Sequence, residues 1–281
     1  MAARIGRSIG TTIPPAAWNF LRSQPLVVVG SVDANQRVWA SLLTGAPGFL
    51  QVVDEHTMRI NARPVAGDPL GDNLTANKQV GLIAIEFATR RRMRLNGNAK
   101  VVADGGIHIH AKQVYSNCPK YIQARRWHAR PPESDDTPVV QRQSTLAQDQ
   151  QQWIREADTF FIATHHSEDG ADASHRGGRP GFVRVLNENR LIWPDYSGNT
   201  MFQTLGNIAV NRQAGLLFID FKRGRTLQLT GRARILWNPE RTAEIAGAER
   251  LVELDVDEAI EITGAHSLEW RFLDYSPENP A

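Results

Sequence analysis

Short apolar runs recur along the chain and predict buried β-strands. Residues 26–29 (Leu-Val-Val-Val) and 160–163 (Phe-Phe-Ile-Ala) are rich in β-branched or aromatic side chains, as strands are. Residues 49–53 and 182–186 predict a second strand in each half. Residues 54–56 and 187–189 supply turn-forming polar side chains directly after them. Each half of the chain therefore begins with the same arrangement of strands.

A single amphipathic helix and two further strands complete the predicted unit. Met201, Leu205 and Ile208 recur at helical spacing and form one apolar face. Residues 215–221 and 226–236 predict two more strands, joined by the basic tip at 222–225. Residues 141–156 lack glycine and proline, which predicts a helix leading into the second half. Several strands with one helix favour a mainly β fold, with one small β-barrel in each half.

The two halves of the chain are copies of one unit. Residues 77–87 align with residues 211–221 at an offset of 134, and six of the eleven positions are identical. Residues 47–49 fall on residues 180–182 at an offset of 133. The polar, proline-rich segment 130–138 connects the copies. We therefore expect a first domain over residues 1–138 and a second over residues 139–281.

Composition and charge narrow the class of protein. The 281 residues are 41% hydrophobic and 22% charged, as in ordinary globular proteins. The net charge of +2 gives no overall attraction to nucleic acid or an anionic membrane. The lone cysteine, Cys118, excludes an intrachain disulfide and fits a reducing compartment. No apolar run approaches the roughly 18 residues that a membrane span needs, and the N-terminus does not resemble a signal peptide. We expect a cytoplasmic protein.

Two neighbouring segments of the second half are candidates for binding an anion. Residues 174–182 place His175 and Arg176 on a glycine-rich stretch before a strand, where guanidinium groups match phosphate oxygens. Residues 193–200 bring hydroxyl and amide groups to the start of the helix, where an anion is favoured. The alternative interpretation is a pair of solvated loops with turn glycines.

The order of these motifs resembles the pyridoxamine 5′-phosphate oxidase-like FMN-binding split barrels. The resemblance spans about residues 153–237 and includes His-Arg-Gly-Gly at 175–178 and Gly-Asn at 198–199. The first half resembles the same family more weakly. In that family two barrels pair and the flavin lies between them. The resemblance therefore implies two tandem split β-barrels packed as an intramolecular pseudo-dimer.

The two copies match the family pattern in different places. His175 and Arg176 align with Leu42 and Leu43, and residues 63–68 lack the Gly-Asn motif. Conversely, residues 117–122 resemble a segment that follows the barrel in flavin-binding relatives, and the second half has nothing similar after Trp237. We therefore expect one composite FMN site per chain, although another flavin is an alternative.

The resemblance implies a role for each candidate residue. Arg176, with Arg179 or Arg225, would neutralise the phosphate, while Ser197 and Asn199 would donate hydrogen bonds. The first half would supply its segment across the interface. The full set of candidate cofactor-binding residues is His175, Arg176, Arg179, Phe182, Val183, Asp195, Ser197, Asn199, Asn207 and Arg225, with Asn117, Cys118, Lys120 and Tyr121 from the first half.

Other chemistry-bearing residues have less specific interpretations. The basic run 90–94 aligns with the tip at 222–225, which favours a hairpin tip or a cofactor-phosphate contact over nucleic-acid binding. His108 and His110 share one strand face, but a metal site is not favoured, because no carboxylate lies at ligand spacing from them. Cys118 beside Lys120 is either an activated thiolate or, more commonly, a packed residue.

Taken together, the residues and the resemblance favour an FMN-dependent oxidoreductase that acts on an unknown small molecule. NAD(P)H as a partner and homodimerisation of whole chains stay open. The alternative is a non-catalytic flavin-binding sensor or carrier, and a third hypothesis is a basic barrel that binds RNA. The electron chemistry would belong to the cofactor, so the sequence assigns no catalytic acid or base.

Overall fold

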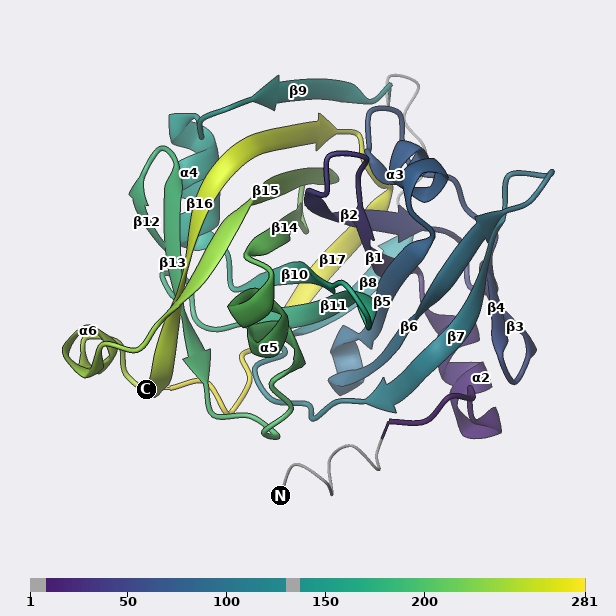
Figure 1. Ribbon diagram of the computed structural model, residues 1–281, viewed down its shortest axis with the longest axis horizontal. Coiled ribbons are helices and arrows are strands. Elements are labelled where there is room, and N and C mark those ends of the chain that lie inside the picture. Colours follow the sequence, from purple (N-terminus) through teal and green to yellow (C-terminus); the bar gives the residue numbers. More distant parts are fainter. Residues whose placement is uncertain (1–8, 130–136, 281) are drawn as a thin grey trace.

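A computed structural model describes residues 9–129 and 137–280 and shows two β-barrels packed against each other (Figure 1). The first barrel is a seven-stranded sheet in the order β2-β1-β5-β6-β7-β4-β3, and its neighbouring strands are antiparallel. Its elements are α2 (Pro15–Ser23), β1 (Leu26–Val32), β2 (Val38–Thr44), β3 (Leu50–Asp54), β4 (Thr57–Ile60), α3 (Leu70–Ala76), β5 (Gln79–Glu86), η1 (Phe87–Thr89), β6 (Arg91–Val101) and β7 (Ile107–Ser116).

The second barrel repeats this plan in the order β11-β10-β14-β15-β16-β13-β12, with β9 added on β16. Each barrel encloses its own apolar core, because alternate strand residues point inward. The elements of the second half are β9 (Val139–Gln143), α4 (Gln148–Glu156), β10 (Thr159–His166), β11 (Gly170–Gly177), β12 (Arg184–Asn187), β13 (Arg190–Tyr196), α5 (Gln203–Val210), β14 (Gln213–Asp220), β15 (Arg225–Leu236), α6 (Pro239–Ala243) and β16 (Ala248–Thr263).

Strand pairing confirms that the two barrels are copies of one unit. Val28 pairs with Leu42 and Ile83, and Phe161 pairs with His175 and Leu217 in the corresponding ladders. His175 therefore occupies the position that Leu42 holds in the first barrel. The mainly β fold with two tandem split barrels, predicted from the sequence, is confirmed.

The barrels pair around a local two-fold relation. β8 (Ala124–Ala129) follows the first barrel, β17 (Leu268–Asp274) follows the second, and the two strands pair with Trp127 opposite Trp270. A shared apolar cluster fills the interface between the barrels. The close approach needs glycine: a Cβ at Gly81 would lie 2.3 Å from the Asp172 backbone. Each barrel thus inserts its first hairpin against the sheet of the other.

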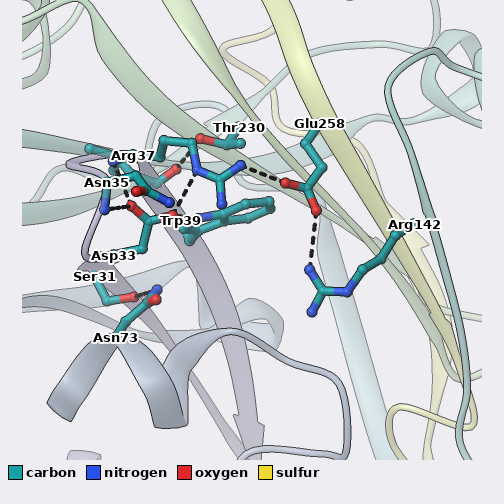
Figure 2. A network of polar contacts seen from close by, with 10 residues as sticks. Ser31, Asp33, Asn35, Arg37, Trp39, Asn73, Arg142, Thr230 and Glu258 are labelled. Carbon is teal, nitrogen blue, oxygen red and sulfur yellow. Dashed lines mark hydrogen bonds and ion pairs between the residues drawn. The ribbon is translucent and has the colours of Figure 1, made fainter. Parts of the chain in front are cut away.

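A chain of ion pairs fixes the β1–β2 hairpin to the second barrel. Arg37 contacts Asp33 through Nε at 2.7 Å and Glu258 through Nη1 at 2.6 Å. Arg142 on β9 binds the other oxygen of Glu258 at 3.1 Å, and Figure 2 shows this sequence of alternating charges. Buried Trp39 lies beside the chain and donates to Asp33. The network joins the first hairpin, β16 and β9 into one rigid interface.

The structure corrects several predicted elements. The helix predicted over residues 141–156 is wrong at its start, because residues 139–143 pair with the edge of β16 and the helix begins at Gln148. The amphipathic helix begins at Gln203, so Met201 lies before it. His175 and Arg176 lie on β11 itself, a strand that the sequence did not predict, and not on a stretch directly before β12. The strand predicted over residues 182–186 begins at Arg184.

Candidate functional site

A cavity of about 120 Å³ lies between the barrels and is lined by both halves of the chain. We call it the cationic cavity, because three arginines and a histidine line it. The first half contributes Arg92 and Arg94 from β6, together with Asn117, Cys118, Lys120 and Tyr121. The second half contributes Ser174, His175, Arg176, Gly177, Phe182, Pro194, Asp195, Tyr196, Ser197, Gly198, Asn199, Thr200, Met201, Phe202, Thr204, Leu205 and Glu249.

Arg92 is a partly buried guanidinium that has no acidic partner among the described residues. Its Nη1 lies 3.0 Å from Nδ1 of His175, and its Nη2 lies 3.9 Å from Sγ of Cys118. Burial lowers the pKa of Arg92 to about 10, and the charges of Arg94 and Arg176 add to this effect. The group stays charged at neutral pH, so an anion in the cavity would relieve a real electrostatic cost.

Arg94 is held by a buried acid from the other barrel. It forms an ion pair with Asp172, which also accepts hydrogen bonds from Asn96 Nδ2 at 3.1 Å and the Tyr115 hydroxyl at 3.0 Å. Burial disfavours the charge of Arg94, but Asp172 raises its pKa above the ordinary value. Because Asp172 balances Arg94, Arg92 is left as the cation with unsatisfied charge.

His175 is neutral and presents an unused donor. Its ring packs against Phe87 and Phe161 with centroid distances of 6.3 and 5.6 Å. Burial, followed by the nearby Arg92, Arg125 and Arg176, lowers the pKa of His175 well below its ordinary value. Since Nδ1 accepts from Arg92, the proton lies on Nε2, which has no partner.

Arg176 reaches the cavity beside an acid that is shared by two arginines. Its Nη1 lies 2.7 Å from Oδ1 of Asp195, and Nη1 of Arg250 lies 3.5 Å from Oδ2 of the same carboxylate. Arg250 also lies over the ring of Phe202, with 5.0 Å from Cζ to the ring centroid. Asp195 therefore orients Arg176 at the wall and Arg250 near Phe202.

Unpartnered buried polar atoms concentrate at this cavity. Four of its lining residues carry a nitrogen donor without a hydrogen-bond partner: Nε of Arg92, Arg94 and Arg176, and Nε2 of His175. Oδ1 of Asn117 is an acceptor without a partner. Buried donors are normally satisfied, because desolvating one without a partner costs about 1–3 kcal/mol. The donor set fits an anionic ligand with several acceptor oxygens.

The segment around Tyr121 brings the first half into direct contact with the second barrel. Tyr121 has a positive φ of 65°, its hydroxyl donates to Ser197 O at 2.7 Å, and its ring lies 5.1 Å from that of Tyr196. A Cβ at Gly177 would lie 2.1 Å from Tyr121 O. Glycine at that position therefore permits the approach that closes one wall of the cavity.

The structure brings ten of the predicted residues together and leaves four outside the cationic cavity. Those that line it are His175, Arg176, Phe182, Asp195, Ser197, Asn199, Asn117, Cys118, Lys120 and Tyr121. Arg179 lies over the ring of Tyr275, and Val183 is buried in the core of the second barrel. Asn207 donates to Thr164 Oγ1, while Arg225 pairs with Asp220 and Glu261.

The sequence allowed a cofactor-phosphate contact for the basic run 90–94, but Arg92 and Arg94 were not among the predicted site residues. They lie in a run of cations predicted as a hairpin tip, but the tip ends at Arg90 and residues 91–101 form β6. In a strand, residues two apart share a face, so Arg92 and Arg94 point toward the cavity while Met93 enters the core. This alternation is the signal in the sequence that distinguishes them. Asp195 likewise lies on β13 and not at a helix start.

Two features of residues 9–129 and 137–280 bear on metal binding and membrane crossing. No group of three or more His, Cys, Asp and Glu side chains in this part of the chain is arranged to hold a metal ion. No helix there has both the length and the apolar character that crossing a membrane requires.

Comparison with known proteins identifies the family. A family model described as pyridoxamine 5′-phosphate oxidase matches residues 13–142 and, a second time, residues 146–271. The chain therefore belongs to this family and carries its domain twice, which confirms the resemblance found in the motifs. No curated protein matches the chain. The predicted boundary at residue 138 lies a few residues before the gap between the matches.

Similar solved structures each cover about one barrel. A HupZ variant from Group A Streptococcus has 14% identity and a TM-score of 0.34, and the match covers 41% of this chain and 98% of that one. A conserved protein of unknown function from Corynebacterium diphtheriae has 14% identity and a TM-score of 0.32, with 44% and 97% covered. The FAD binding protein from Mycobacterium smegmatis has 14% identity and a TM-score of 0.30, with 42% and 95% covered.

Proposed function

We propose that the chain is an FMN-binding oxidoreductase with one composite flavin site, located at the cationic cavity. The observation that carries this proposal is the unpaired guanidinium of Arg92 beside Arg176 and His175, on a wall built from both barrels. A phosphate dianion supplies the charge and the acceptor oxygens that these buried donors lack. Membership of the pyridoxamine 5′-phosphate oxidase family supports a ligand of the flavin class.

The size of the cavity suggests which part of the cofactor these residues hold. A volume of about 120 Å³ suits a phosphate group and the adjoining chain. Arg92 and Arg176 would neutralise the phosphate, while His175 Nε2 would donate a further hydrogen bond. Tyr121, Tyr196 and Phe202 would provide aromatic contacts for the ring. The bound flavin would supply the electron-transfer chemistry for oxidation or reduction of a small molecule.

The test is a titration of the purified chain with flavins of different phosphate content. We expect FMN to saturate at one per chain and riboflavin, which lacks the phosphate, to bind at least 100-fold more weakly, because losing the charged phosphate contacts costs about 2.7 kcal/mol or more. Equal affinity for both, or two equivalent FMN sites per chain, would contradict the proposal. FAD in the same titration distinguishes FMN from another flavin.

Turnover then separates an enzyme from a flavin-binding sensor or carrier. The FMN-loaded chain is mixed anaerobically with NADH or NADPH, and the flavin absorbance is followed before and after oxygen is admitted. Repeated reduction and reoxidation with consumption of the nicotinamide supports an oxidoreductase. A flavin that these donors leave oxidised supports the non-catalytic alternative, or an enzyme reduced by its own substrate.

A further inference from the structure

A second and larger cavity is lined mainly by residues of the second half of the chain, and it shares no lining residue with the cationic cavity. Its volume is about 770 Å³, within the range of small-molecule sites. We call it the aromatic cavity, because Trp153, Phe221, Trp270, Phe272 and Tyr275 line it. Residues of α4, of the tip between β14 and β15, and of β17 line it. Figure 1 labels this helix and these strands.

The aromatic rings form a fixed surface. The rings of Phe221 and Trp270 meet edge to face at 5.5 Å, and Cζ of Arg225 lies 4.4 Å from the ring centroid of Trp153. Cζ of Arg125 lies 4.2 Å from the ring centroid of Phe221. Aromatic rings held in this way offer a flat ligand stacking area at low entropic cost.

Two buried polar atoms in this cavity are unused. Thr159 is 3% exposed and its Oγ1 has no hydrogen-bond partner, and Nε1 of Trp270 also lacks one. Both side chains belong to residues that line the aromatic cavity. A hydroxyl and an indole N–H in this situation call for a ligand acceptor, because leaving them desolvated is unfavourable.

Some cations around the aromatic cavity form ion pairs and others do not. Arg125 is paired with Asp158 at 2.5 Å, and Arg225 is paired with Asp220 and Glu261. Lys222 and Arg223 at the β14–β15 tip are exposed and make no ion pair among the described residues. Asp149 and Glu156 on α4 form the opposite wall, so an anionic group is favoured at the tip.

The first barrel provides an internal control for these features. At corresponding positions it carries Leu26 in place of Thr159, and Ala88 and Thr89 in place of Lys222 and Arg223. Phe87 and Trp127 keep the aromatic character there. The duplicated unit thus has the unpaired cations and the unused hydroxyl on its second copy.

We infer that the aromatic cavity binds a flat aromatic ligand that carries an anionic group. Its ring would lie among Trp153, Trp270 and Phe272, its acceptor atoms would meet Thr159 and Trp270, and its charge would lie at Lys222 and Arg223. This inference does not depend on flavin binding at the cationic cavity, since the two sets of lining residues are separate.

The probe is anilinonaphthalene sulfonate, an anion with a flat naphthalene ring, compared with uncharged phenylnaphthylamine, which has the same ring system. Isothermal titration of the full chain should give one sulfonate per chain, bound more tightly than the uncharged compound. Lys222→Ala with Arg223→Ala should weaken sulfonate binding about tenfold and leave the uncharged compound unchanged. Lys100→Ala with Lys112→Ala removes the same charge from the exposed surface of the first barrel and should have no effect.

Conservative variants locate the ligand within the cavity. Thr159→Val keeps the shape of the side chain and removes one donor, while Trp270→Phe removes the other donor and keeps an aromatic ring of smaller size. Thr159→Val should weaken sulfonate binding about threefold to fivefold, and Trp270→Phe at least as much. Arg92→Ala should leave it unchanged. The inference is overturned if the intact chain does not bind the sulfonate, if binding is lost with Arg92→Ala, or if the tip variant and its surface control behave alike.

Discussion

The two barrels meet in two related places, and these places have opposite character. One is the cationic cavity. The other, which we call the filled position, is formed by the residues that correspond to the cavity residues in the opposite half of the chain. Strand pairing gives the correspondence: Thr226 and Gln228 take the places of Arg92 and Arg94, and Leu42 and Leu43 take those of His175 and Arg176. The cations of the cavity thus have neutral counterparts.

The filled position is closed by the protein's own side chains. Trp39 corresponds to Asp172 and packs with Ile260 and Ile262, while Val65 and Val140 cover them. Val140 comes from β9, the strand that pairs with the edge of β16 (Figure 1). Where the cavity has a buried acid holding an arginine, the filled position has an indole in a small apolar core.

A few polar groups remain at the filled position, and Asp68 accepts hydrogen bonds from several of them, although Oε1 of Gln228 has no partner. Asp68 accepts from Ser41 Oγ at 2.7 Å, from Gln228 Nε2 at 3.0 Å and from Leu70 N at 2.8 Å. In the cavity, by contrast, four buried donors have no partner: Nε of Arg92, Arg94 and Arg176, and Nε2 of His175. The comparison teaches that one copy of a duplicated interface is closed by apolar packing, while the other keeps costly unpaired donors of the kind that an anion would satisfy.

The largest expected effect follows from emptying the filled position. Trp39 is 1% exposed, so Trp39→Ala should lower the free energy of unfolding by about 4 kcal/mol, from lost burial and a cavity. Urea denaturation followed by circular dichroism measures this. Trp39→Phe, which keeps most of the packing, is the control and should cost about 1–2 kcal/mol. A loss below about 1 kcal/mol for the alanine variant would show that the position does not contribute core stability.

Removing the Arg92 guanidinium should weaken FMN binding, whereas the matched change at the filled position should not. Arg92→Ala should weaken FMN binding about 100-fold, because a buried charged partner of a phosphate is worth about 2–3 kcal/mol. Thr226→Ala, the matched change at the filled position, should alter FMN affinity less than twofold. Fluorescence quenching of FMN on binding gives both dissociation constants. Similar effects of the two variants would contradict the assignment of the phosphate to the cationic cavity.

The sequence predicted the contrast between the copies better than its details. The alignment of the two halves already placed Leu42 and Leu43 at the positions of His175 and Arg176, because the repeat preserves the strand register. Arg225 was predicted as a phosphate ligand, yet Glu261 on β16 pairs with it at 2.8 Å, a contact across 36 residues that a local pattern does not contain. Local motifs indicated the site, and long-range pairing decided which cations are free.

The same physical reason explains the error at β9. Its glutamine-rich continuation over residues 141–156 has ordinary helix propensity, but residues 139–143 gain backbone hydrogen bonds and burial at the edge of β16. Tertiary pairing therefore overrides propensity in this segment. The strand also brings Val140 over the filled position, a role that no repeat comparison shows, since β9 precedes the second copy.

Titration of Asp68 should give the filled position a distinctive pH dependence. Burial raises the pKa of Asp68 to about 6, from 3.8, against the lowering effect of its hydrogen bonds. The folded state therefore holds this proton more tightly than the unfolded state, and its contribution to stability is lost as pH rises from about 4 to about 6. The full shift corresponds to about 3 kcal/mol, and we expect about 2 kcal/mol.

Asp68→Asn removes this dependence. Urea denaturation at pH 4.5 and pH 7.5 gives the free energy of unfolding of the variant minus that of the unmodified chain. This difference should favour the variant by about 2 kcal/mol more at pH 7.5 than at pH 4.5. Comparing the two proteins at each pH cancels the titration of other groups. Asp72→Asn, an exposed change nearby on α3, should show no such difference. An equal effect of Asp68→Asn at both pH values would mean that the carboxyl titrates normally.

The smallest expected effect concerns a hydrogen bond that joins the two halves of the chain at the wall of the cationic cavity. The Tyr121 hydroxyl donates to Ser197 O at 2.7 Å and so ties the first half to the segment that carries Asn199. Tyr121→Phe removes this bond but keeps the ring against Tyr196, and should weaken FMN binding about fivefold, the value of one hydrogen bond. Tyr196→Phe is the matched control, because its hydroxyl makes no hydrogen bond within the described residues, and should change affinity less than twofold. Equal effects of the two variants would mean that the rings alone matter, and that the link between the halves does not organise the site.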